Sequence, residues 1–262
     1  MPEIKPVGDR AITVEFANEI SIPTNQKVHA LDRRLTQAGI PGIVETVPTY
    51  RTLIVHYEPS VIRYAELKEK VAGFLDDLNT TQTQKEIVIE LPVLYGGEVP
   101  LDDESIRYDG WDGKETAPDM EEIMAYEKLS REEVIQRHSK NLCYVYFQAF
   151  AVGHSYVGNP EKVFTIPRRS SPRTKIPRGT IAIWADQTVL NGVDLPCGWN
   201  LIGRTPVMLY DERKAEPSYY QPGQWVKFVP ITVEEYEKIH KEALAGTYQP
   251  VMYEKDAGKE NV

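Results

Sequence analysis

Apolar residues recur along the first third of the chain with two different periods. Alternating apolar and polar positions, rich in β-branched residues, are typical of strands, and a spacing of three or four is typical of helices that face a core. Thr24 is the expected N-cap of the first helix and Gly39 its stop. Strands are predicted at 11–16, 43–47, 53–57 and 86–94, and helices at 25–38 and 60–78. This order, strand-helix-strand-strand-helix-strand, is the ferredoxin-like α+β pattern, which implies no function by itself.

The rest of the chain is patterned mainly as short strands separated by turns, which favours a β-barrel or a sandwich. Residues 101–118 are acidic and polar and are interpreted as a surface insertion, and residues 251–262 as a fraying tail. Ser130 and Glu133 form a capping box at the start of one predicted helix. Strands are expected at 142–151, 180–185, from 199, at 207–210 and at 225–230, and helices at 119–126, 130–139 and 232–244.

A polar stretch without a period, TTQTQ at 80–84, separates the two patterned regions and is interpreted as a linker. The predicted domains are therefore 1–84 for the α+β unit and 85–232 for the β-rich unit with its helical insertion. Residues 233–262 are expected to form a C-terminal helix and tail.

Composition narrows the class of protein. The chain has 262 residues and a formal charge of −9, which argues against a general binder of nucleic acid or of anionic membranes. Cys143 and Cys197 match no zinc or redox spacing. No apolar run is long enough to span a bilayer, and the N-terminus lacks the apolar core of a signal peptide. We therefore expect a cytoplasmic protein.

A basic loop stands out against this acidic background. Residues 164–178 carry three prolines and five cations, and prolines fix φ and remove backbone donors, so the loop is expected to be stiff and outside any ladder. The cations are Arg168, Arg169, Arg173, Lys175 and Arg178. Such a loop could hold an anion, or it could be a solvated face, which is the commoner role of a charge cluster. The residues alone leave both interpretations open.

Two histidines are candidate proton carriers, because imidazole titrates near neutral pH. His138 ends the predicted helix 130–139, where the helix dipole favours an imidazolium. His154 lies beside Ser155 in a glycine-rich loop, but adjacency in sequence does not make a catalytic dyad. A purely structural role is the alternative for each.

An ordered set of short motifs makes the chain resemble one family. It resembles the B-type subunit of 5-oxoprolinase, also called allophanate hydrolase subunit 1 or the sporulation-kinase-inhibitor family, and one half of the carboxyltransferase region of urea carboxylase. The matching segments are GDRA at 8–11, VPTY at 47–50, LPVLYGGE at 91–98, His138, PRR at 167–169, PR at 172–173, IPRG at 176–179, QT at 187–188, GW at 198–199, LIGRTP at 201–206, PG at 222–223 and VKFVPI at 226–231.

The resemblance implies a fold, an activity and a partner. The fold would be a ferredoxin-like βαββαβ domain followed by a cyclophilin-like β-barrel. The activity would be ATP-linked opening of 5-oxoproline or a related amide or lactam, with biotin involved only if the chain takes part in carboxyl transfer. The partner would be a companion of the type of the 5-oxoprolinase C component or allophanate hydrolase subunit 2. A second branch inhibits a sensor histidine kinase, so a regulatory binding protein is the alternative.

The resemblance also gives weight to an anion site for a small amide or lactam substrate. Arginine offers a planar, always charged fork for a carboxylate or phosphate. Tyr156 and Trp199 could wall the pocket or pack in the core, and core packing is the favoured interpretation for Trp199. The candidate substrate-binding residues are Arg169, Arg173 and Arg204 as anion holders, Gln187, Thr188 and Thr205 as neutral hydrogen bonders and Tyr156 as a pocket wall, with His138 and His154 as catalytic candidates.

The chain departs from the family at one loop, and its acidic insertion at 102–118 is also longer than usual. We expect the core fold to survive both departures. The family pattern is G-F-x-P-G-F-x-Y-x-G-G, whereas residues 149–159 read AFAVGHSYVGN, with Val152 in place of proline and His154 in place of phenylalanine. This departure leaves the substrate open.

Overall fold

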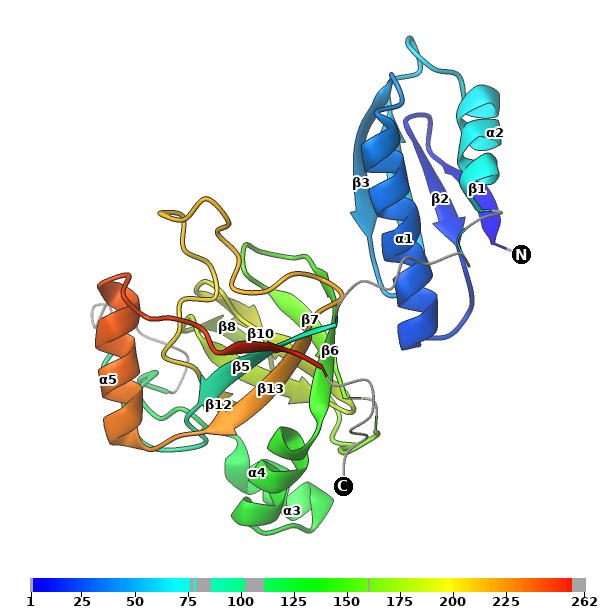
Figure 1. Ribbon diagram of the computed structural model, residues 1–262. Helices are drawn as coiled ribbons and strands as arrows, with labels where there is room; N and C mark the ends of the chain where they lie inside the picture. Colours follow the sequence, from blue (N-terminus) through cyan, green and yellow to red (C-terminus); the bar gives the residue numbers. More distant parts are fainter. Residues whose placement is uncertain (1, 76–77, 79–85, 102–110, 160, 256–262) are drawn as a thin grey trace. The chain divides into compact units, whose positions relative to one another are not determined.

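The computed structural model describes residues 2–75, 78, 86–101, 111–159 and 161–255, and its contacts divide the chain into two units, Met1–Lys85 and Glu86–Val262 (Figure 1). Both units mix helices and sheets, so the predicted α+β class is confirmed. The predicted linker at 80–84 and most of the acidic segment, 102–110, lie outside the described residues. None of the described helices is long and apolar enough to cross a membrane.

The first unit is a four-stranded antiparallel sheet in the order β1-β2-β4-β3, covered by two helices. Its core contains Val14, Leu31, Leu53 and Val71, which are fully buried and come from β2, α1, β4 and α2. The elements are β1 Glu3–Val7, β2 Ala11–Glu15, α1 Ile22–Ala38, β3 Ile43–Pro48, β4 Thr52–Tyr57 and α2 Tyr64–Leu75.

The strand order corrects the predicted ferredoxin-like pattern at one point. The edge position beside β2 is taken by β1, which was not predicted, and the strand predicted at 86–94 belongs to the other unit. β1 is mostly exposed and contains Pro6, as edge strands often do, so it carries no alternating apolar signal.

The first helix begins earlier than predicted. Ser21, not Thr24, is its N-cap, and the Ser21 side chain accepts a hydrogen bond from the Thr24 backbone N–H. Gly39 ends the helix in the left-handed region with φ 55°, as predicted. Asn25 is fully buried and its amide donates to the carbonyls of Thr49 and Tyr50, which fixes the turn between β3 and β4.

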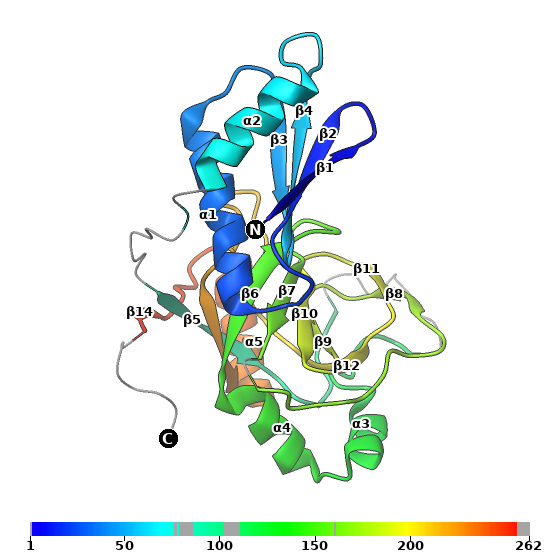
Figure 2. The same cartoon turned by 90° about the vertical axis from the view of Figure 1, so that its right-hand side faces the viewer.

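The second unit is built on an eight-stranded sheet in the order β12-β9-β10-β7-β6-β13-β5-β14 (Figures 1 and 2). A single bridge joins Leu94, just after β5, to Arg204 of β12, so the sheet curls until its seventh strand meets its first. The predicted barrel is therefore closed by one bridge and not by a full ladder. The strands are β5 Ile87–Val93, β6 Leu142–Gln148, β7 Ser155–Gly158, β9 Thr180–Trp184, β10 Gln187–Leu190, β12 Asn200–Arg204, β13 Trp225–Pro230 and β14 Met252–Glu254.

Two apolar clusters lie on opposite faces of this sheet. The main core takes residues such as Val145, Val157 and Ile183 from the strands, together with Ile123 and Val134 from the helices. A smaller cluster on the other face contains Ala182, Val189 and Trp199, so Trp199 is packed as the sequence suggested. The helices are α3 Met120–Glu127, α4 Arg131–Lys140 and α5 Val233–Leu244, and capping boxes begin α4 at Ser130 and α5 at Thr232.

Several predictions for the second unit were wrong. Part of the basic loop is in a ladder, because β8 (Arg173–Ile176) pairs with β11 (Leu195–Cys197). The strand expected at 207–210 is absent from the described chain, where Tyr210 makes only an isolated bridge to Ser218. The beginning of the expected tail forms β14, which pairs with β5. Prolines and charges mask short strands whose ladder partners are distant in sequence.

Candidate functional site

A cavity of about 420 Å³ opens in the second unit. Its walls come from the turn before β9, the segment after β10, the end of β12 with the residues that follow, and helix α5. Arg204 and Thr205, two of the predicted substrate-binding residues, line it together with Arg178, Gly179, Gly192 and His240. A concave site that gathers polar groups from several elements is the usual form of a small-molecule site.

Backbone hydrogen bonds hold these walls together. The Gly179 N–H donates to the Asn191 carbonyl at 2.7 Å, and the Thr205 N–H donates to the Gly179 carbonyl at 2.9 Å. Gly179 has φ 78°, and a Cβ at this position would lie 2.5 Å from the Thr205 carbonyl oxygen. Only glycine fits such a close approach without strain. The start of β9 and the end of β12 are thereby held side by side in the cavity wall.

The cavity carries charges of both signs. Arg178 and Arg204 provide guanidinium groups, and Asp194 and Glu212 provide carboxylates. Asp194 accepts from the Arg178 backbone N–H at 2.9 Å and pairs with Lys175 at 3.4 Å. Arg204 is 3% exposed, and its Nη2 donates to the Gly113 carbonyl. A buried arginine held in one orientation can present a fork to a small carboxylate.

His154 lies in the loop next to this cavity. An added Cβ on Gly192, in the cavity wall, would meet the Val152 carbonyl at 2.5 Å, so the two segments touch. His154 Nδ1 lies 3.0 Å from Asn191 Oδ1, while Asn191 Nδ2 donates to the Thr180 carbonyl at 2.7 Å. Because Asn191 Oδ1 can only accept, His154 donates from Nδ1. Burial lowers the pKa of His154 to about 4, so this imidazole is neutral at pH 7.

His138 lies in the main core and not in the cavity wall. It is 2% exposed, its ring stacks on Phe228 with centroids 4.3 Å apart, and its Nδ1 lies 2.7 Å from the Tyr95 hydroxyl. Its Nε2 lies 3.1 Å from the hydroxyl of Thr188, another predicted site residue. Burial lowers the pKa of His138 to about 3. The expectation that the helix dipole favours a protonated His138 is therefore wrong, because the cost of desolvating the charged ring outweighs the effect of the dipole.

The buried histidines predict an acid-sensitive fold. The unfolded chain takes up a proton at His138 near pH 6.5, whereas the folded protein does not until about pH 3, so stability falls as the pH falls through this window. Between pH 7 and pH 5 one such histidine costs about 2 kcal/mol of unfolding free energy. Urea denaturation at pH 7 and at pH 5 measures how much unfolding free energy is lost between the two. We expect this loss to be smaller by about this amount in His138→Gln than in the wild type. An equal loss in both proteins would refute this assignment.

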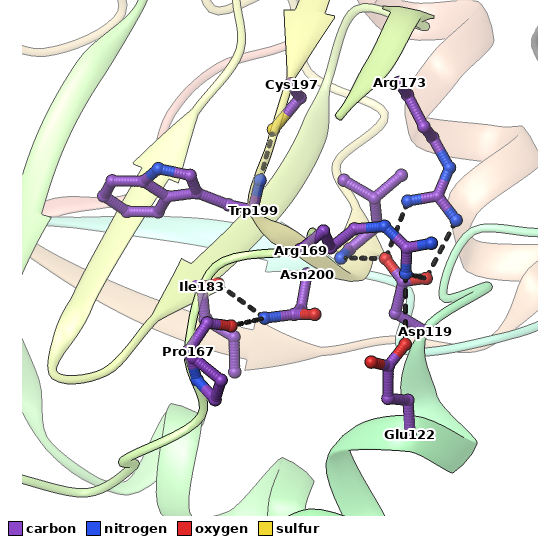
Figure 3. Close-up of polar contacts among 10 residues, drawn as sticks. Asp119, Glu122, Pro167, Arg169, Arg173, Ile183, Cys197, Trp199 and Asn200 are labelled. Atoms are coloured by element: carbon purple, nitrogen blue, oxygen red, sulfur yellow. Dashed lines mark hydrogen bonds and ion pairs between the residues drawn. The ribbon is translucent and has the colours of Figure 1, made fainter. Parts of the chain in front are cut away.

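Arg169 and Arg173 lie on a different structure, an ion-pair cluster around Asp119 (Figure 3). Arg173 binds both oxygens of Asp119, with Nη1–Oδ2 and Nη2–Oδ1 at 2.8 Å, and Arg169 Nη1 binds Oδ1 at 2.7 Å. Asp119 also accepts the Leu201 N–H at 2.7 Å, and its side chain is 3% exposed. Arg169 makes a further contact to Glu122 at 3.1 Å. These pairs tie the basic loop to α3 and β12.

Tyr156 and Gln187 lie on adjacent strands, β7 and β10, and neither lines the cavity. Tyr156 stacks on Phe147 with centroids 4.6 Å apart and contacts His154 edge-on at 5.0 Å. Of the nine predicted site residues, the structure thus brings Arg204 and Thr205 into the cavity and His154 beside it. The other six lie in the core, in the Asp119 cluster or on the sheet.

Three residues of this region escaped the sequence analysis. His240 faces the cavity from α5, one turn after the lining residue Tyr236, and this i, i+4 pair was a usable signal. Asp119 has the sequence context of an ordinary helix N-cap, yet its side chain makes no capping bond. Asn191 gave no signal, because its role depends on strand pairing across β9 and β10.

The residues of the cavity do not fit a triphosphate. A nucleotide would bring several negative charges against the carboxylates of Asp194 and Glu212, and the sequence has no GxxxxGK[ST] phosphate loop. Within the described ranges no cluster of three or more His, Cys, Asp or Glu side chains could hold a metal ion.

Comparison with known proteins identifies the family. Residues 2–220 match the family described as carboxyltransferase domain, subdomain C and D. The B-type subunit of 5-oxoprolinase from Bacillus subtilis (strain 168) is 30% identical over 255 residues, which cover 92% of this chain and 98% of that protein. The chain belongs to the family of B-type 5-oxoprolinase subunits.

Two solved structures with this fold have longer chains than the present one. The crystal structure of TTHA0988 aligns with this chain with a TM-score of 0.69 and 27% sequence identity. The alignment covers 85% of this chain but only 40% of the TTHA0988 chain. The urea carboxylase of Kluyveromyces lactis aligns with a TM-score of 0.74 over 97% of this chain and 24% of its own. At 20% identity the latter shows a shared fold alone. The chain therefore spans less than half of either solved relative.

Proposed function

We propose that this chain is one subunit of a two-component enzyme that processes a small carboxylated lactam or amide, and that the cavity beside Arg204 holds the substrate. Membership of the 5-oxoprolinase family of B-type subunits supports the reaction class. The observation that carries the choice of site is the meeting of Arg178, Arg204 and Thr205 around a space of about 420 Å³. The lactam 5-oxoproline, which carries one carboxylate, is the candidate substrate.

In this proposal the chain binds and orients the substrate. Arg204, with Arg178, holds the carboxylate, and Thr205 donates a hydrogen bond to a neutral oxygen of the ring. The neutral His154, its tautomer fixed by Asn191, lies behind the cavity wall. ATP would be bound elsewhere in the assembled enzyme, since this cavity does not suit it. Biotin would enter only in carboxyl transfer, where Arg204 could hold the carboxylated ureido group.

A substrate panel tests this assignment. The purified chain mixed with a companion of the 5-oxoprolinase C-component type, in the presence of ATP, should open 5-oxoproline. Its kcat/KM should be at least tenfold lower for 2-pyrrolidinone, which has the same ring without the carboxylate. The reason is that the charge-assisted hydrogen bonds to the carboxylate are lost. Equal kcat/KM for the two lactams would contradict carboxylate recognition. Kinase inhibition, the regulatory alternative, stays a prediction.

A further inference from the structure

Two of the segments through which the chain resembles its family, LPVLYGGE at 91–98 and LIGRTP at 201–206, meet in the second unit. Leu94 and Arg204 exchange both of their backbone hydrogen bonds, with N–O distances of 2.9 and 3.0 Å. An added Cβ on Gly203 would lie 2.8 Å from the Leu94 carbonyl oxygen, so the two segments touch. The backbone of Arg204, the proposed anion holder, is therefore fixed by the first of these segments.

The guanidinium of Arg204 is held at a different point. Its Nη2 donates to the carbonyl of Gly113, a buried residue with φ 82°. Arg204 is 3% exposed, so water cannot easily replace this acceptor. Because the guanidinium is a rigid planar fork, a fixed acceptor on one of its N–H groups sets the direction of the whole group. The orientation of Arg204 thus depends on where the Gly113 carbonyl lies.

The residues that follow Gly113 are bound to the turn at the end of the first segment. The Thr116 N–H donates to the Gly97 carbonyl at 3.1 Å. The Thr116 hydroxyl accepts the Gly96 N–H at 3.0 Å, and Thr116 is 1% exposed. Residues 114–117 therefore run beside this turn and carry the Gly113 carbonyl with them.

The side chain of Glu115 fastens the two pieces of backbone to each other. Its Oε1 accepts the Ala117 N–H at 2.9 Å and the Gly97 N–H at 3.2 Å, and its Oε2 lies 3.3 Å from the same Gly97 nitrogen. Hydrogen bonds from backbone N–H groups to a carboxylate are among the stronger ones in proteins. One half-buried side chain thus bridges the turn and the segment that begins at Gly113.

We propose that Glu115 is a positioning residue for substrate binding, because it keeps the Gly113 carbonyl where it orients the guanidinium of Arg204 toward the carboxylate of the lactam. The inference rests on the proposed function, in which Arg204 binds that carboxylate. Glu115 does not line the cavity, and its negative charge does not favour a carboxylate ligand. Its contribution is the placement of the backbone from 113 to 117.

Two lactams test this role in the assembled enzyme with ATP present. Glu115→Ala should lower kcat/KM for 5-oxoproline about tenfold, because a misaligned guanidinium loses much of its charge-assisted hydrogen bond to the substrate. It should leave kcat/KM for 2-pyrrolidinone unchanged, since that lactam has no carboxylate for Arg204 to bind. Glu121→Ala is the matched control, because the Glu121 side chain is 80% exposed on α3. It should change neither value.

Two further substitutions separate the geometry of Glu115 from its charge. Glu115→Gln keeps the length of the side chain and one acceptor oxygen, so it should retain most of the wild-type kcat/KM for 5-oxoproline. Glu115→Asp keeps the charge but is one carbon shorter, so it should reproduce the loss. This milder change also answers the question if the alanine variant does not fold, which its melting temperature would show.

The outcomes distinguish this inference from the function on which it rests. Unchanged discrimination between the two lactams in Glu115→Ala and Glu115→Asp, while Arg204→Ala loses it, would overturn the inference alone. An equal loss for both lactams would show a general distortion of the cavity, and a loss in Glu115→Gln but not in Glu115→Asp would show an effect of charge. Either result would also overturn the inference. Equal kcat/KM for the two lactams in the wild type would contradict the proposed carboxylate site itself.

Discussion

Asp119→Ala is expected to lower the free energy of unfolding by about 3–5 kcal/mol, the usual cost of removing one partner from a buried ion pair. Asp119 neutralises Arg173, whose side chain is 11% exposed, and shares Arg169 with Glu122. It also satisfies the buried Leu201 N–H. Its loss leaves a charged fork and a backbone donor in a poorly solvated place.

The neighbouring carboxylate provides the control for this prediction. Glu122 also binds Arg169, but its side chain is 61% exposed, so Glu122→Ala should cost less than about 1 kcal/mol. Urea denaturation of both variants at pH 7 measures the difference. Similar losses in the two variants would show that the cluster around Asp119 is no more than a solvated charge group.

Arg204→Ala is expected to weaken substrate binding by about ten- to a hundredfold in the assembled enzyme, because a charge-assisted hydrogen bond contributes roughly 1.5–3 kcal/mol. Arg204→Lys should recover only part of the affinity, since an ammonium cannot reproduce the planar fork. Affinity for 5-oxoproline and melting temperature should be measured on the same samples, because Arg204 is buried and also supports the Gly113 segment.

Substitutions of two further arginines test whether the lactam carboxylate binds in the cavity or at the basic loop. Arg168 is exposed in the basic loop and does not line the cavity, so Arg168→Ala should leave the affinity for the lactam unchanged. Arg173→Ala should lower stability through the Asp119 pair, and the affinity of its folded fraction should change little. A loss of affinity in Arg168→Ala equal to that in Arg204→Ala would move the anion site from the cavity to the basic loop.

The sequence predicted those elements whose apolar pattern reports burial on one side. The strands β2, β4 and β13 and the helix α4 follow such patterns, and the capping box at Ser130 fixed where α4 begins. The pattern could not reveal β1 or β14, because edge strands bury little. Their positions are set by partners along the ladder.

The candidate site was predicted in part for a similar reason. Arginines in a proline-rich loop signal anion binding and structural pairing equally well, and the difference lies in what sits opposite them. Asp119 meets Arg173 across 54 positions of sequence, a contact that only the fold creates. Arg204 differs from Arg173 in this respect. It was predicted to bind substrate together with Thr205 of the same motif, and in the structure both residues line the cavity. His138 was predicted as a catalytic candidate because a single sequence does not show whether the end of a helix is buried.

The central claim is that this chain works as one half of an enzyme. Its most direct test is the rate of 5-oxoproline opening, with ATP present, by the purified chain alone, by the companion alone and by their equimolar mixture. We expect turnover in the mixture alone, with a rate that saturates as the companion is titrated to a one-to-one ratio. Turnover by the single chain at the rate of the mixture, or no turnover of any lactam or amide by a mixture that forms a complex, would contradict the account.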